Sequence, residues 1–243
     1  MTVLARTCAS VGRTERGKVR ERNEDAYLNS PEHGLWVVAD GMGGHQCGDL
    51  ASQLIVSSVA AIARYTDLDD RLFAVRECLR GVNHRLGKGV AARAGDSAPV
   101  IGSTVVALLI EGPRAVCVWA GDSRCYLWRE QRLYQLTRDH SLLQKLIADE
   151  HMCSREAAQH PGAHALTRAV GGGDGLSLEV VELDVRCGDV FVLCSDGLYQ
   201  AVDHQVLGNA LNNRSPRLTV DLLFDHVLRG PASDNLTAVV VRT

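Results

Sequence analysis

The strongest constraint on the fold is the segment at residues 36–45, in which an apolar run ends at Asp40 and is followed by a glycine-rich stretch. A short β-branched run of this kind is typical of a buried strand, and the glycines let the chain turn sharply and its backbone approach a ligand. An ionised aspartate at the end of a buried strand is costly unless cations or hydrogen bonds compensate its charge. The segment therefore favours a metal site, although one aspartate in this position could equally be a turn or helix-cap residue.

Three further aspartates follow strand-like runs in the same way, namely Asp122, Asp196 and Asp234. Four acids in such positions suggest one oxygen-rich centre. Mg²⁺ and Mn²⁺ prefer carboxylate, carbonyl and water ligands, and several carboxylates can hold two such ions close enough to share a bridging hydroxide. We therefore expect a centre that binds two Mn²⁺ or Mg²⁺ ions.

The overall charge and the first residues of the chain limit the partners that we expect. A formal net charge of −3 over 243 residues argues against nucleic-acid binding by bulk electrostatics, though it leaves room for a local basic patch. The first residues lack both the charged region and the long apolar core of a secretory signal. No segment of membrane-spanning length is free of polar residues. The 8 cysteines include no Cys-x-x-Cys pair, and several fit buried reduced thiols. We expect a cytoplasmic monomer that binds neither nucleic acid nor membrane.

The apolar pattern predicts one α+β domain over residues 1–243, with sheets inside and helices outside. Strands are expected at residues 2–11, 101–110, 115–120, 125–128 with a hairpin to Leu133, 165–170, 178–185, 190–194 and 236–242. Helices are expected at residues 49–65, 72–86, 141–147, from Ser154 onward with Ser154 as the cap, 203–212 and 216–228. Residues 12–18 are expected to be a polar connector, Gly87 to end the second helix, and residues 87–99 to form a loop. Residues 141–165 are the part expected to move.

Eight short motifs occur in an order that resembles one protein family. They are Arg20-x-x-Asn23-Glu24-Asp25, Asp40-Gly41-Met42-Gly43-Gly44-His45, Gly102-Ser103-Thr104, Gly121-Asp122-Ser123-Arg124, Asp139-His140-Ser141, Leu166-Thr167-Arg168-Ala169-Val170-Gly171, Ser195-Asp196-Gly197 and Asp234-Asn235-Leu236-Thr237. Each motif is weak alone, but the ordered set covers nearly the whole chain and resembles the metal-dependent protein phosphatases of the PPM family, in particular the bacterial single-domain members. The resemblance implies a four-layer α-β-β-α sandwich of two antiparallel sheets flanked by helical pairs, with the metals in a cleft at one end.

The resemblance also implies a role for each acidic residue. Asp40 is similar to the ligand that bridges both metals, and the Gly41 carbonyl is similar to a ligand of the first metal. Asp25 resembles an acid that reaches a metal through water. Asp196 and Asp234 are similar to the ligands of the second metal, and Asp122 with Asp196 resembles the site of a third, weaker ion.

Two residues that are not ligands are expected to act in phosphate chemistry. Phosphate monoesters resist hydrolysis, so an enzyme must supply a strong nucleophile, neutralise charge and donate a proton. Arg20 can grip the phosphoryl oxygens bidentately, although the charged cluster at residues 17–27 could equally be a solvated edge. His45 is suited to protonate the departing serine or threonine oxygen, and it could equally be a surface residue in a turn.

The resemblance implies hydrolysis of phosphoserine and phosphothreonine on proteins, which reverses a bacterial kinase. Among family members the chain looks like the phosphatase that opposes the kinase of type VI secretion, whose target is a protein with a forkhead-associated domain. The rival interpretations are a catalytically weak regulator of the same fold that binds phosphoproteins, and a phosphatase that acts on anti-sigma antagonists. Two departures from the family are Ala163-His164 where relatives carry Arg-Asn and Tyr199-Gln200 where they often carry Thr-Asp. Both are expected to alter substrate recognition and to touch no predicted ligand.

Overall fold

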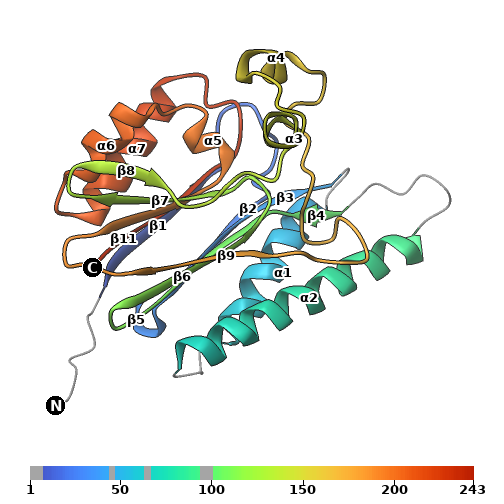
Figure 1. Ribbon diagram of the computed structural model, residues 1–243, viewed down its shortest axis with the longest axis horizontal. Helices are drawn as coiled ribbons and strands as arrows, with labels where there is room; N and C mark the ends of the chain where they lie inside the picture. Colours follow the sequence, from blue (N-terminus) through green and yellow to red (C-terminus); the bar gives the residue numbers. More distant parts are fainter. Residues whose placement is uncertain (1–7, 44–46, 63–66, 94–100) are drawn as a thin grey trace.

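Two antiparallel sheets form the centre of the computed structural model, which describes residues 8–43, 47–62, 67–93 and 101–243 (Figure 1). The first sheet contains, in spatial order, β1 (Ala9–Glu15), β11 (Leu236–Arg242), β10 (Val190–Cys194), β7 (Arg124–Arg129) and β8 (Arg132–Gln135). The second contains β2 (Asp25–Ser30), β3 (Leu35–Met42), β5 (Val105–Glu111), β6 (Arg114–Ala120) and β9 (Glu179–Asp184). A two-residue strand, β4 (Gly102–Ser103), pairs with the end of β3, and the 3₁₀ turn η1 (Pro31–His33) joins β2 to β3.

Helices cover the outer face of each sheet (Figure 1). The pair α1 (Gly48–Ala60) and α2 (Leu68–Arg93) packs on the second sheet, and the pair α6 (His204–Leu211) and α7 (Pro216–Arg229) packs on the first. The short helix α5 (Asp196–Tyr199) follows β10, and α3 (Leu142–Asp149) packs against α4 (Ser154–Gln159) at one end of the sandwich. The expected α-β-β-α fold class is confirmed.

Three apolar layers hold the sandwich together. Trp36 and Phe191 are fully buried between the two sheets. Ile55 of α1 belongs to a second buried cluster under the second sheet, and Phe224 of α7 to a third under the first sheet. Full burial of a side chain of this size contributes roughly 1.5–3 kcal/mol relative to exposure, so the order of the layers follows from the apolar faces of the elements.

The first strand ends four residues later than the sequence pattern predicts, so the predicted connector is wrong at residues 12–15, while residues 2–7 of the predicted strand lie outside the described residues. Strand β1 continues to Glu15 because each of its residues pairs with β11, from Ala9 opposite Arg242 to Glu15 opposite Leu236. Its polar side chains are satisfied on the way, since the Arg13 guanidinium lies 4.7 Å from the centre of the Phe224 ring. Because β1 is an edge strand and its residues are only partly buried, it can form without alternating apolar and polar residues.

Two predicted boundaries on the helices are also wrong. Helix α2 passes through Gly87 to Arg93, because glycine in a helix costs only about 1 kcal/mol and the neighbouring residues are good helix formers. The predicted loop is therefore wrong at residues 87–93, and residues 94–99 lie outside the described residues. Ser154 is the first residue of α4 rather than its cap, and the cap residue, Cys153, makes no side-chain capping bond. Ser141 instead caps α3, where its side chain accepts a hydrogen bond from the backbone of Gln144.

The predicted strand at residues 165–170 does not form. Leu166 makes an isolated bridge to Ser141, and Val170 makes another to Ser103. The segment therefore pairs with two different parts of the chain, one residue at a time, and forms no continuous strand. The predicted strand at residues 101–110 is divided at Thr104 into β4 and β5. The remaining strands and helices lie within a few residues of their predicted positions.

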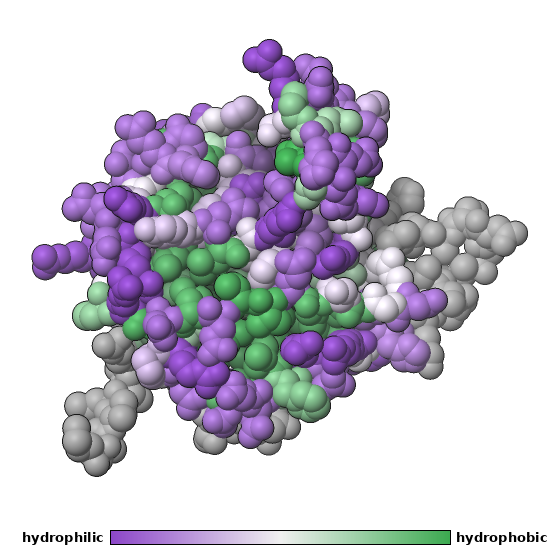
Figure 2. Space-filling model, viewed as in Figure 1, coloured by the Kyte–Doolittle hydropathy of each residue, from purple (hydrophilic) through white to green (hydrophobic). Residues whose placement is uncertain are grey.

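Apolar side chains are visible on one side of the sandwich, between β7 and β9 (Figure 2). The outermost strands there are β8 and β9, and Val181, Leu183 and Leu136 pack on the core between the sheets while staying partly exposed. In the part of the chain that the structure describes, no helix is both long and apolar enough to cross a membrane.

Candidate metal centre

The pairing of β2 with β3 places Asp25 directly opposite Asp40. Asp40 lies near the end of β3, directly after five fully buried residues from Leu35 to Ala39. Gly41 comes next, and a Cβ at this position would lie 2.0 Å from the carbonyl oxygen of Gly48. The absence of a side chain therefore lets the start of α1 pack onto the end of β3, beside the two acids.

Asp25 is buried, and only one of its carboxylate oxygens has a partner. Ser195 Oγ donates a hydrogen bond to Asp25 Oδ2 at 2.7 Å, whereas Oδ1 is buried without a hydrogen-bond partner. A buried polar atom left in this way costs about 1–3 kcal/mol, unless an ion or a water molecule fills its place. Ser195 also accepts a bond from the backbone of Thr237 at 3.1 Å, so it connects the Asp25 of one sheet to β11 of the other.

The backbone of Asp40 is fixed by Thr104. Asp40 N donates to Thr104 Oγ1 at 3.0 Å, and Thr104 N donates to the Asp40 carbonyl at 2.8 Å. The Thr104 hydroxyl also contacts that of Ser123 at 2.7 Å. The break between β4 and β5 thus serves to bring a threonine against the backbone of the central acid.

The other candidate ligands come from the first sheet and from a connection between the sheets. Asp196 is the first residue of α5, just after β10, and Asp234 lies in the loop just before β11. Asp122 lies in the turn between β6 and β7. These strands bring them into one cavity of about 340 Å³. Six predicted site residues line it: Arg20, Asp40, Gly41, Asp122, Asp196 and Asp234. Asp25 does not line the cavity and lies buried opposite Asp40.

Burial and mutual repulsion raise the pKa values of four of these carboxyl groups. Burial is the largest cause in each case, and it raises the pKa of Asp25 to about 6 and that of Asp122 to about 7. The pKa of Asp196 is also raised, and that of Asp40 lies well above its ordinary value. After burial, the charges of Asp25, Asp196, Asp122 and Asp234 are the further causes for Asp40, which stands at the centre of the group.

Arg20 reaches the cavity from the loop before β2. Its Nη2 donates to Asp234 Oδ2 at 2.6 Å, and about half of its side chain is exposed. Asn235 holds this loop, because its Oδ1 accepts a bond from Glu24 N at 2.8 Å and its Nδ2 donates to the carbonyl of Arg22 at 2.8 Å. The charged cluster at residues 17–27 is therefore more than a solvated edge, since part of it is built onto the cavity.

The donor atoms fit a hard divalent cation. They are carboxylate and carbonyl oxygens, and one buried carboxylate oxygen lacks a partner among the described residues. Arg20 and Arg124 do not offset the crowded negative charge, since the pKa values of Asp40, Asp122 and Asp196 stay raised. No three acidic, histidine or cysteine side chains within the described ranges are arranged to hold one ion by themselves. Mg²⁺ keeps several water ligands in most protein sites, so the cavity suits ions that are bound in part through water.

Sequence reasoning missed three residues that support the acids, namely Ser195, Asn235 and Gln200. It also predicted that the departures from the family touch no ligand, which is wrong for the second one. Gln200 Nε2 donates to Asp196 Oδ2 at 2.9 Å, and His164 of the first departure lines the cavity. The short spacing between Asp196 and Gln200, four residues across a helical turn, was the available signal for the contact. His45 lies outside the described residues.

Tyr199, the other residue of the second departure, packs beside the Asp122 turn. Its ring lies 3.6 Å from the guanidinium carbon of Arg124, and Arg124 binds both carboxylate oxygens of Asp139, at 2.9 and 2.7 Å. Arg124 also donates to the hydroxyl of Tyr126 at 2.9 Å. This group fixes the start of β7, so Tyr199 packs against a residue that supports the Asp122 turn without itself lining the cavity.

Known proteins share both the sequence pattern and the fold of this chain. A family model described as protein phosphatase 2C matches residues 14–238. The serine/threonine protein phosphatase PstP of Mycobacterium tuberculosis is 33% identical over 228 residues, which make up 94% of this chain and 43% of PstP. The chain thus spans less than half the length of that curated relative.

Two solved structures are similar over nearly their whole length. PppA, described as a key regulatory component of T6SS in Pseudomonas aeruginosa, is 41% identical with a TM-score of 0.88 and covers 98% of each chain. The catalytic domain of PstP in complex with two manganese ions is 31% identical with a TM-score of 0.85 and covers 97% of each chain.

Proposed function

The chain belongs to the protein phosphatase 2C family, and we propose that it hydrolyses phosphoserine and phosphothreonine on proteins with the help of divalent metal ions. One observation carries the proposal: aspartates from both sheets meet in and directly behind one cavity, beside Arg20. An inactive relative that only binds phosphoproteins has no need to keep this costly group of buried acids. The intact group therefore favours catalysis.

The proposal assigns the acids to two ions, Mn²⁺ or Mg²⁺, with a third at a weaker site. Asp40 would serve both ions, the Gly41 carbonyl would bind the first and Asp196 with Asp234 the second, while Asp25 would act through water. Asp122 and Asp196 hold the third. When bound, the ions neutralise phosphoryl charge and lower the pKa of water that attacks phosphorus. The manganese complex of the PstP catalytic domain supports this choice of cation.

The remaining steps fall to side chains of this protein. Arg20 has five N–H donors and makes only one bond to Asp234, so it retains donors that can face two phosphoryl oxygens. Asp234 orients the guanidinium toward the cavity from the side. His45 donates the proton to the departing serine or threonine oxygen, and a group that titrates near neutral pH can then be reprotonated by solvent.

The substrate of the proposed reaction is a phosphoprotein made by a bacterial serine/threonine kinase in the cytoplasm. PppA is described as a regulator of T6SS, and this likeness supports a role in type VI secretion with a forkhead-associated-domain protein as the substrate. Residues 141–165 act as a mobile flap on a single catalytic domain. His164 near the end of this segment and Leu166 just after it line the cavity, which supports contact between the flap and the substrate.

Hydrolysis of a phosphothreonine peptide by the purified protein tests the proposal. Phosphate release should require Mn²⁺ and stop with a chelator, and it should disappear in Asp40→Asn and in Asp196→Asn. The matched control is Asp174→Asn, because Asp174 is exposed and does not line the cavity. A folded, metal-loaded protein that releases no phosphate from peptide or aryl phosphate would instead support the phosphoprotein-binding regulator.

A further inference from the structure

Gly121 holds the turn that carries Asp122. Its φ angle is +112°, a conformation that side chains rarely adopt, and a Cβ here would lie 2.6 Å from the Cβ of Thr104. Thr104 in turn bonds the backbone of Asp40 in both directions. Gly121 therefore packs against Thr104, which holds the predicted ligand Asp40, and it directly precedes the predicted ligand Asp122 in the chain.

The side chain and backbone of His140 both bind Gly121. His140 N donates to the Gly121 carbonyl at 2.9 Å, and Gly121 N donates to the imidazole Nδ1 at 3.1 Å. A backbone N–H can only donate, so Nδ1 carries no proton and the ring proton of a neutral imidazole is on Nε2. Nε2 lies 3.0 Å from Glu179 Oε1, which is the acceptor for that proton.

The surroundings hold the ring in this orientation. The imidazole stacks on Trp119 with a 6.1 Å distance between ring centroids and an angle of 11°. Arg168 Nη1 donates to the same Glu179 oxygen at 3.0 Å, and it lies 3.3 Å from Nε2. Burial is the main cause that lowers the pKa of the His140 imidazole, which supports a neutral ring.

His140 also lies where the two ends of the segment 141–165 meet the sandwich. The His140 carbonyl accepts a bond from Thr167 N at 2.8 Å, and the next residue, Ser141, makes its bridge to Leu166. Leu166 lines the cavity together with Asp122. One residue thus connects both ends of the proposed flap to the Asp122 turn.

We propose that His140 is a positioning residue, and that its neutral imidazole, accepting at Nδ1 from Gly121, places Asp122 for the weaker metal site and ties that site to the flap. The inference rests on the proposed function, because it takes Asp122 as part of the metal centre. His140 itself does not line the cavity. Its role depends on one acceptor atom, which a substitution can keep or remove.

Two amide variants separate the acceptor from the rest of the ring. The Asn amide can place an oxygen near the position of Nδ1, whereas the Gln amide reaches the position of Nε2. His140→Gln should weaken Mn²⁺ binding at the Asp122-dependent site by about 10–100-fold, as expected when a group that orients a ligand is lost. His140→Asn should restore most of that affinity. Free Mn²⁺ can be counted by electron paramagnetic resonance, and Asp122→Asn identifies which site is lost.

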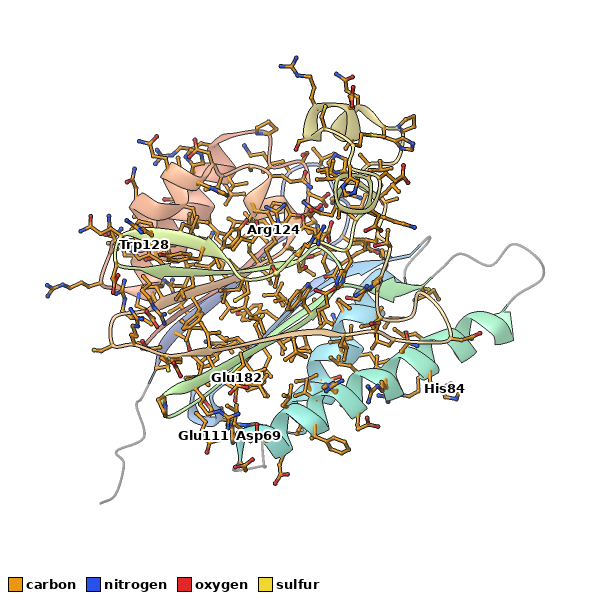
Figure 3. All side chains as sticks on the ribbon, in the orientation of Figure 1. Asp69, His84, Glu111, Arg124, Trp128 and Glu182 are labelled. Carbon is orange, nitrogen blue, oxygen red and sulfur yellow. The ribbon has the colours of Figure 1, made fainter. Side chains whose placement is uncertain are left out.

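A control and a double variant make the binding result specific. His84 is exposed on α2 and points away from the sandwich (Figure 3), so His84→Gln should bind Mn²⁺ as the unmodified chain does. His140→Gln should cause no further loss at this site when added to Asp122→Asn. Equal loss in the Asn and Gln variants, or loss that adds to that of Asp122→Asn, would overturn the proposal.

A metal-free readout distinguishes this inference from the proposed function. In ¹⁵N NMR spectra of the protein with chelator, His140 should show the Nε2–H tautomer, and the Gly121 amide should shift in His140→Gln more than in His140→Asn. An Nδ1–H tautomer would disprove the arrangement whatever the enzyme does. If the tautomer and the Mn²⁺ affinities are as predicted but the protein has no phosphatase activity, the proposed reaction is wrong and the positioning role of His140 still holds.

Discussion

Gln200 donates a hydrogen bond from Nε2 to Asp196 Oδ2 at 2.9 Å, so a residue four positions beyond a proposed metal ligand orients that ligand. Relatives often have an acid at this position, and a neutral amide donor changes what the ligand contacts. The departure from the family at Gln200 thus changes a direct contact of a proposed metal ligand, Asp196.

Gln200→Ala should weaken Mn²⁺ binding by up to about fivefold, because Gln200 is exposed and water screens its bond to Asp196 to roughly the 0.2–1 kcal/mol of an exposed charged pair. Isothermal titration of Mn²⁺ measures the change. Gln205, exposed on α6, provides the matched control as Gln205→Ala. Equal affinities in the two variants would show that the contact with Asp196 does not support the metal.

Asp40→Asn should make the metal-free protein more stable while it loses the stabilisation by Mn²⁺. The substitution removes the buried charge that four other aspartates repel, and a gain of about 1 kcal/mol would raise the melting temperature by roughly 2–4 °C in a chain of this size. Thermal unfolding with chelator and with Mn²⁺ measures both effects. A lower melting temperature of the variant in chelator would mean that the Asp40 carboxylate contributes more through hydrogen bonds than it costs by repulsion.

The metal-free protein should lose stability as pH rises from about 4 to about 7. The pKa of Asp25 is about 6 and that of Asp122 about 7 in the folded state, against roughly 4 in an unfolded chain. Between these values the folded state binds more protons, so the free energy of unfolding falls by up to about 1.4 kcal/mol per pH unit for each group. Urea unfolding in chelator at several pH values measures the slope, and Asp122→Asn should make it shallower. A slope that Asp122→Asn leaves unchanged would contradict the assignment.

Two glycine substitutions should change stability in opposite directions. Gly41→Ala places a Cβ against the Gly48 carbonyl oxygen and should cost about 1–3 kcal/mol or more. Gly81→Ala, on an exposed position of α2 with no atom within 4 Å of the new Cβ, should stabilise by about 1 kcal/mol. Chemical unfolding of both variants gives the comparison. A neutral Gly41→Ala would mean that the start of α1 can move away from β3 at little cost.

The sequence pattern located the cavity because its acids stand at the ends of apolar runs. Asp40 ends the apolar run within β3, and Asp122 and Asp196 follow β6 and β10. Because β3 and β6 both pair antiparallel with β5, they run in the same direction and end at the same edge, where the cavity lies. What supports the acids was harder to foresee. The Asn235 bond to Glu24 joins residues 211 positions apart, and no local pattern indicates such a partner.

Errors in the predicted elements share a related cause. Residues 165–170 have the composition of a strand, yet they bridge Ser141 and Ser103 in turn because the chain crosses the end of the sandwich there. The end of β1 is fixed by β11, far along the chain. Tertiary contacts, which propensity does not contain, decide these segments.

The pairing of β1 with β11 has a consequence for biosynthesis. β1 has β11 as its only strand neighbour within the described part of the chain, and Asp234 enters the cavity just before β11. A nascent chain on the ribosome therefore lacks both a partner for its first strand and one wall of its cavity until residue 242 has emerged. The proposed metal centre is therefore complete only once β11 has docked between β1 and β10.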